Sequence, residues 1–321
     1  MKLNELLAES ISLTKYTSQT ETVLINHFIK SLDISSSMDA IRNNAPSIDQ
    51  MITDLSTVFY LQLKQPMSKL LINFANSVIA EPGTLTSVEI TQLPADVLGQ
   101  AVGSTMKLSI LFFIRMREIY QDILTDLLPS KIVLYKKNSN DVDTVFNIVS
   151  SNKFMNLIKR DSTINELLIK LADIFLHEMV HIIQEEQMHI YAYKNKKDLS
   201  DVNSYKSYLS DKTLTNYKGQ DEYLQKELDD EHDDRWKKLY YADAREITAY
   251  AHNFVQSLMR KYKPADNKNW PSLNSIARDI PKMVKELMTP TTPNELKVYN
   301  RYLKLVYQEL DVAYSAATKP Q

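Results

Sequence analysis

The segment from Ser162 to Met188 constrains the fold more than any other part of the chain. It contains no glycine and no proline, and most residues between Leu167 and Ile183 are apolar. At about 100° per residue, the polar exceptions fall on one narrow stripe, made of Lys170, Asp173, His177, His181 and Gln184. A helix that is apolar almost all round is a buried helix. The pattern therefore predicts a long buried helix with a single polar stripe, starting at a capping box of Thr163 and Glu166.

The middle of this stripe has the pattern H-E-x-x-H, formed by His177, Glu178 and His181. Two histidines four residues apart share one face of a helix, so both imidazoles can bind one metal ion. The glutamate beside the first histidine would then act as general base for the attacking water. The alternative is a core helix with two hydrogen-bonded histidines, in a helical binding protein. Metal binding also explains why all three residues lie in an apolar environment.

A catalytic zinc site needs a third protein ligand and one open position. We expect that ligand on a second helical segment, Trp236–Lys261, where Asp243 and Glu246 are the only carboxylates. Glu246 has the longer side chain, and Ala249 lies one turn further along. A residue as small as alanine lets two helices approach closely. We therefore predict Glu246 as the third ligand, with Asp243 as its rival.

The two segments together resemble the glutamate zincins (gluzincins), in particular the zinc metallopeptidases inferred from phage and bacterial genomes. Those proteins pair H-E-x-x-H-x-x-Q on one helix with E-x-x-A-x-A on a later one, and residues 177–184 and 246–251 match these patterns. The resemblance covers about residues 130–260. It implies a zincin fold, with a small sheet packed on the H-E-x-x-H helix and one zinc ion per chain. The interval between the two motifs is longer here than in the family pattern.

Residues around the metal are expected to orient the ligands and to stabilise charge. Metal-bound imidazoles usually donate their second N–H to a carboxylate or carbonyl group, and Asp173, Gln184 and Asp243 are candidates for that acceptor. A tyrosine or histidine commonly stabilises the oxyanion in such enzymes. The candidates by sequence position are Tyr250, Tyr240, Tyr241, His232 and His252.

Composition limits the partners and the compartment. The net charge of −2 gives no indication of a nucleic-acid partner, and no apolar stretch reaches the length of a membrane span. The chain has no cysteine, so it forms no disulfide and is suited to a reducing environment. The N-terminal residues lack the continuous apolar core of a signal peptide. We expect a cytoplasmic protein, or a virion protein if the chain is encoded by a phage.

Glycine is scarce, with 4 residues in 321, which favours helices over hairpins. The sequence predicts N-terminal helices at Leu3–Lys15, Thr20–Leu32, Ile48–Leu63, Met67–Ala80 and Ser104–Leu128. Further helices are expected at Ser272–Leu287 and Asn294–Ala316. Strands are expected at Lys131–Tyr135 and Val142–Ser150, with a strand or extended link at Thr84–Leu93.

The predicted fold class is α+β and predominantly helical. We expect a helical N-terminal region at residues 1–128, followed by a zincin-like catalytic domain at 129–321 with a polar insertion at about 187–235. The insertion contains an acidic run at residues 229–234, which is typical of a solvated segment.

These features predict a zinc-dependent peptidase that acts on a protein or peptide substrate. The alternative is a structural or assembly protein, as in a phage particle, that keeps the zincin fold with little or no catalysis. In that case the N-terminal helical region would bind virion or assembly partners.

Overall fold

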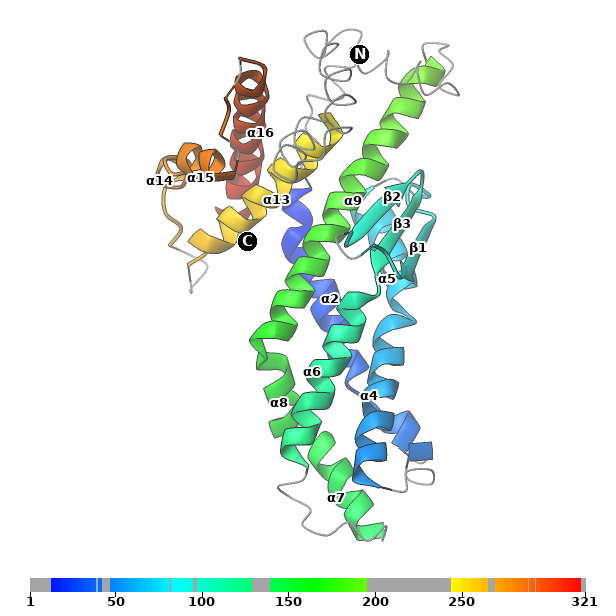
Figure 1. Ribbon diagram of the computed structural model, residues 1–321. Coiled ribbons are helices and arrows are strands. Elements are labelled where there is room, and N and C mark those ends of the chain that lie inside the picture. Colours follow the sequence, from blue (N-terminus) through cyan, green and yellow to red (C-terminus); the bar gives the residue numbers. More distant parts are fainter. Residues whose placement is uncertain are drawn as a thin grey trace. The chain divides into compact units, whose positions relative to one another are not determined.

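The computed structural model describes residues 13–38, 40–41, 47–80, 82–94, 97–128, 139–194, 244–264, 269–287, 289–291 and 293–318. Within these ranges the side chains of residues 14, 139–143, 187–194, 244–246, 294 and 297 are not described. The described chain is mostly helical and includes one three-stranded sheet (Figure 1). This agrees with the predicted α+β, predominantly helical class.

The chain divides into two compact units. The first is Ser18–Phe175, and the second combines Met1–Thr17 with Leu176–Gln321. They are called the N-terminal and C-terminal units below. The division into compact units does not test the predicted domain boundary at residue 128, which stays a prediction.

The helices of the N-terminal unit follow the hydrophobic pattern of the sequence. They are α2 (Thr17–Ser31), η2 (Ser35–Ser37), α4 (Ile48–Lys64), α5 (Met67–Phe74), the π-helical turn η3 (Ala75–Ile79), α6 (Leu111–Leu127), α7 (Ser139–Val149), α8 (Asn152–Arg160) and the first part of α9 (Ser162–Lys194). The helices predicted at Thr20–Leu32, Ile48–Leu63 and Met67–Ala80 are confirmed. The region of the predicted helix Leu3–Lys15 lies mostly outside the described residues.

The N-cap of helix α9 lies two residues before Thr163, the first residue of the predicted capping box. The Asp161 side chain accepts a hydrogen bond from the Ile164 backbone N–H at 2.9 Å, so Asp161 is the N-cap and Thr163 lies inside the helix. A cap residue accepts from the N–H three positions later, and Asp161 satisfies that geometry as well as threonine would. The start of the helix was therefore misplaced, although the helix itself was predicted.

A chain of aromatic rings fills the core of the N-terminal unit. Phe28 of α2 meets Phe59 of α4 edge-on at 5.8 Å, and Phe59 stacks on Tyr120 of α6 at 4.4 Å. Tyr120 meets Phe154 of α8 edge-on at 5.7 Å. All four side chains are almost fully buried. Each aromatic pair contributes about 0.5–1.5 kcal/mol beyond the area it buries, so this chain ties four helices together.

The sheet has the strand order β1-β3-β2, with β1 (Ser87–Thr91), β2 (Gly99–Val102) and β3 (Thr105–Ser109). β1 runs parallel to β3, and β2 runs antiparallel to it. Gly103 lies in the two-residue turn between β2 and β3 with φ of +58°. Hairpin turns of this length need positive φ, which glycine adopts without strain. The extended segment predicted at Thr84–Leu93 is confirmed by β1.

Two predictions in this unit are wrong. Residues 142–150, expected to be a strand, form most of α7, where Val145, Phe146 and Val149 are buried at helical spacing. The β-branched residues favoured a strand, but the spacing of the buried positions has the helical period. The start of the helix predicted at Ser104–Leu128 is strand β3, because the hairpin at Gly103 pairs that segment with β2. The strand predicted at Lys131–Tyr135 lies outside the described residues.

The C-terminal unit is built around α13 (Ala244–Tyr262) and α16 (Pro293–Thr318), which pack together with η1 (Thr14–Tyr16). Short helices α14 (Leu273–Ala277) and α15 (Ile280–Leu287) pack on α16 (Figure 1). The helices predicted at Ser272–Leu287 and Asn294–Ala316 are therefore confirmed, the first of them split in two. The core of this unit is formed by apolar residues of α13, α14, α15 and α16.

One buried polar pair interrupts this apolar core. His252 of α13 and Glu309 of α16 are each 1% exposed, and their Nδ1 and Oε2 atoms lie 3.7 Å apart.

The second part of α9 continues to Lys194, and the remainder of the predicted insertion, with its acidic run, lies outside the described residues. Within the described ranges, no helix combines the length and the apolar character that crossing a membrane requires.

Candidate functional site

The two motif histidines meet on the buried part of α9. His177 is 9% exposed, His181 is half-buried, and their rings lie 4.9 Å apart at an interplanar angle of 78°. Their Nε2 atoms are 3.2 Å apart. All residues from Phe175 to Val180 are buried, as expected for a helix that is apolar on nearly every side. The helix therefore brings one nitrogen of each imidazole ring close together on the same face.

The distance between the two nitrogens fits a shared metal ion. With zinc–nitrogen bonds of about 2.05 Å and tetrahedral angles, two ligand nitrogens lie about 3.3 Å apart. The observed 3.2 Å is close to that value, and both rings approach with the same nitrogen, Nε2. At this distance one N–H···N hydrogen bond would also fit, but two Nε2–H groups would clash. At least one of the two Nε2 atoms therefore carries no hydrogen.

Helix α13 places two side chains against His177. The Asn253 Nδ2 atom lies 3.1 Å from His177 Nδ1, and the Tyr250 ring lies 5.3 Å from the His177 ring in an edge-on arrangement. The Tyr250 carbonyl accepts a hydrogen bond from the Tyr302 hydroxyl of α16, which ties this turn of α13 to the unit's core. Ala249, which precedes Tyr250 on this helix, is fully buried.

The predicted third ligand, Glu246, lies in the first turn of α13. Glu246 belongs to α13, but its side chain lies outside the described set, and Asp243 lies outside the described residues altogether. Position 246 is four residues before Tyr250 and seven before Asn253, so all three share one face of the helix. That is the face in contact with His177. Among described side chains, no group of three or more metal-binding residues is present.

The remaining predicted residues occupy α9. Glu178 is 7% exposed, which places a carboxyl group in the buried section next to His177. Gln184, one turn beyond His181, is 6% exposed, and its Oε1 atom has no hydrogen-bond partner among the described residues. Asp173 is half-buried one turn before His177 on the same helix.

The candidates for oxyanion stabilisation differ in whether they lie near His177. Tyr250 lies against His177, whereas His252 is buried beside Glu309 of α16 instead. Tyr240, Tyr241 and His232 lie outside the described residues.

Asn253 is the contact that the sequence did not predict. An asparagine in an amphipathic helix normally indicates a surface position, and nothing in its immediate sequence suggests otherwise. The one available signal is its spacing of seven residues from Glu246, which puts both on the same face of the helix.

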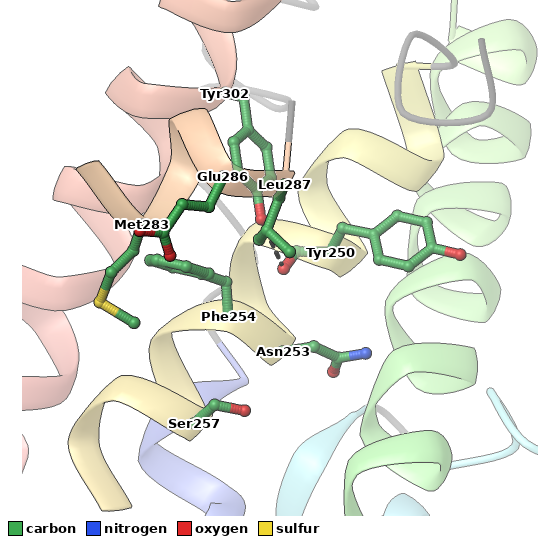
Figure 2. A pocket seen from close by; sticks show the side chains of 8 residues that line it. All are labelled: Tyr250, Asn253, Phe254, Ser257, Met283, Glu286, Leu287 and Tyr302. Carbon is green, nitrogen blue, oxygen red and sulfur yellow. Dashed lines mark hydrogen bonds between the residues drawn. The ribbon is translucent and has the colours of Figure 1, made fainter. Parts of the chain in front are cut away.

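A pocket of about 390 Å³ adjoins this face of α13. Tyr250 and Asn253 form the wall nearest α9, and their side chains point toward that helix (Figure 2). Phe254 of α13 with Met283 and Glu286 of α15 lie on the opposite side of the pocket (Figure 2). The pocket is therefore mainly apolar, with one carboxylate, and shares a wall with the histidine site.

Comparison of this chain with protein-family models, with curated proteins and with solved structures finds no match.

Proposed function

We propose that this protein is a zinc-dependent peptidase of the gluzincin type. The observation that carries the proposal is the separation of 3.2 Å between the Nε2 atoms of His177 and His181, which suits two ligands of one zinc ion. Glu178 follows His177 directly in the same buried section of α9. This combination of residue types is that of a metal-assisted hydrolase.

His177, His181 and Glu246 would hold the metal, with Asp243 as the rival third ligand. Zinc in such a site supplies Lewis-acid chemistry, which makes water a better nucleophile and polarises the carbonyl of the substrate. Glu178 takes the proton from the attacking water and passes it to the leaving amine, so that one carboxylate serves first as base and then as acid.

The α13 side of the site would bind and stabilise the substrate. Tyr250 lies beside His177, and its hydroxyl points toward α9 in Figure 2, so it is our candidate donor to the developing oxyanion. The adjoining pocket of about 390 Å³ is within the size range of ligand pockets and would receive a substrate side chain.

The decisive variant is Glu178→Gln, which keeps the shape of the side chain and removes its ability to accept a proton. We expect cleavage of a mixed peptide library to fall at least 100-fold, consistent with the contribution of a general base, while zinc content stays at about one ion per chain. Glu166→Gln is the matched control, because Glu166 is an exposed glutamate on the same helix. Substantial cleavage by Glu178→Gln would rule out the mechanism.

A second candidate is a structural or assembly protein, such as a phage-particle component, with little or no catalysis. It is favoured by the N-terminal unit, whose aromatic core ties together helices that hydrolysis does not use. Purified protein without zinc, together with stoichiometric presence in a particle, would support this candidate over the peptidase.

A further inference from the structure

The described contact at His177 Nδ1 is made by the Asn253 amide, at 3.1 Å. This contact matters because a neutral imidazole carries only one N–H. When Nε2 binds a metal, the proton must lie on Nδ1, and an acceptor beside Nδ1 favours that tautomer. Whatever faces Nδ1 therefore controls how readily His177 acts as a ligand.

The Asn253 amide is able to supply that acceptor. Its oxygen and nitrogen are nearly equal in shape, so the amide fits the same space after a rotation of 180° about the Cβ–Cγ bond. In the present orientation Nδ2 faces His177, and the buried Oδ1 has no hydrogen-bond partner in the described part of the chain. In the rotated orientation Oδ1 accepts the Nδ1–H hydrogen bond.

The scaffold holds Asn253 at this position. It lies one turn after Tyr250, whose ring contacts His177 and whose carbonyl is bonded by Tyr302 of α16. Val255, two residues further along α13, is fully buried in the core shared with α16. The amide is therefore presented to His177 by a well-packed helix.

We propose that Asn253 is a positioning residue for the metal centre, whose side-chain carbonyl holds His177 as the Nδ1–H tautomer and directs its Nε2 lone pair toward the metal. This inference rests on the proposed zinc-binding function, and it adds a residue that neither sequence motif contains. Orienting groups of this kind typically change metal affinity 10- to 100-fold.

The first test uses the metal-free protein and does not depend on activity. At about pH 9, above the ordinary histidine pKa, nitrogen NMR of the His177 ring should show the Nδ1–H tautomer. Asn253→Asp can only accept, so it should show the same tautomer as the wild type. Asn253→Leu should weaken the preference. A wild-type Nε2–H tautomer that changes to Nδ1–H in Asn253→Asp would overturn the proposal, because it would mean that the asparagine donates.

The second test measures the affinity for zinc alone. We expect Asn253→Leu to bind zinc 10- to 100-fold more weakly and Asn253→Asp to bind at least as tightly as the wild type. Asn165→Leu is the matched control, since it removes an amide that bonds the Lys159 carbonyl near the start of α9, and it should not affect zinc affinity. Wild-type affinity in Asn253→Leu contradicts the proposal. If the leucine variant does not fold, the aspartate comparison still decides.

The two proposals fail in different ways. If the wild-type protein binds no zinc at all, the proposed function fails, while the tautomer measurement still reports on the role of Asn253. If zinc binds with equal affinity to the wild type and Asn253→Leu, the metal site stands and the role of Asn253 is refuted.

Discussion

Removing the hydroxyl of Tyr120 should stabilise the protein. Tyr120 is 0% exposed, it lies between Phe59 and Phe154, and its OH has no hydrogen-bond partner among the described residues. A buried polar group without a partner costs about 1–3 kcal/mol. Tyr120→Phe keeps both ring contacts and removes that group. We therefore expect a gain of about 1–2 kcal/mol in the free energy of unfolding at neutral pH.

The same burial predicts how stability depends on alkaline pH. Burial raises the pKa of Tyr120 above its ordinary value of 10.0. Above that value the unfolded chain loses the proton and the folded chain keeps it, so the stability contribution present below pH 10 is lost as pH rises. The loss is about 1.4 kcal/mol per pH unit until the folded pKa is reached, and Tyr120→Phe should remove this part of the pH dependence.

Urea unfolding, followed by circular dichroism at neutral pH and at about pH 11, measures both effects. Tyr60→Phe on the neighbouring helix α4 is the control. Tyr60 is half-buried, so this variant measures the effect of removing a hydroxyl from a tyrosine that is not fully buried. Destabilisation of Tyr120→Phe by more than about 1 kcal/mol at neutral pH would refute the reasoning, since it would show that the hydroxyl makes a favourable bond.

Two other predictions concern the C-terminal unit. The Tyr262 hydroxyl donates to Asp279 at 2.6 Å and holds the carboxyl pKa below its ordinary value of 3.8, so this stability is present above that pH and is lost in more acidic solution. Tyr262→Phe should therefore be less stable than the wild type at neutral pH, with a difference that shrinks on acidification in chemical unfolding; a constant difference would contradict this account. Leu287→Trp should narrow the pocket of about 390 Å³ and lower kcat/KM for peptide cleavage without changing zinc content. Unchanged kcat/KM would exclude the pocket as a substrate site.

Much of the helical fold could be predicted because the apolar spacing is regular. Helix α4 follows its predicted range to within one residue, and the Ser47 side chain caps it by accepting from the Gln50 N–H. Helix α9 was predicted from the absence of glycine and proline and from its polar stripe. These signals are local, so they can be identified in the sequence without knowledge of tertiary contacts.

The errors arise where distant segments decide the structure. Strand β3 has residues compatible with a helix, and it is extended because β1 and β2 pair with it on either side. The residues of α7 are rich in valine and isoleucine, which favours a strand, yet the burial of Val145, Phe146 and Val149 requires a helix. Propensity is a weak guide where the partner is not known.

The same difference between local and distant contacts applies to the candidate site. His177 and His181 are neighbours on one helix, so their common approach follows from spacing alone. Asn253 is 76 residues away from His177, and only the packing of α13 on this part of α9 brings its amide to Nδ1. The role of Glu246 remains a prediction based on the shared helix face.

The zinc content of the purified protein tests the central claim most directly. We predict about one zinc ion per wild-type chain by elemental analysis, and loss of that zinc in both His177→Ala and His181→Ala. The exposed Glu166→Gln variant should keep it. A wild-type chain that binds no zinc, or zinc that persists when either histidine is replaced, would contradict the metal centre proposed for this protein.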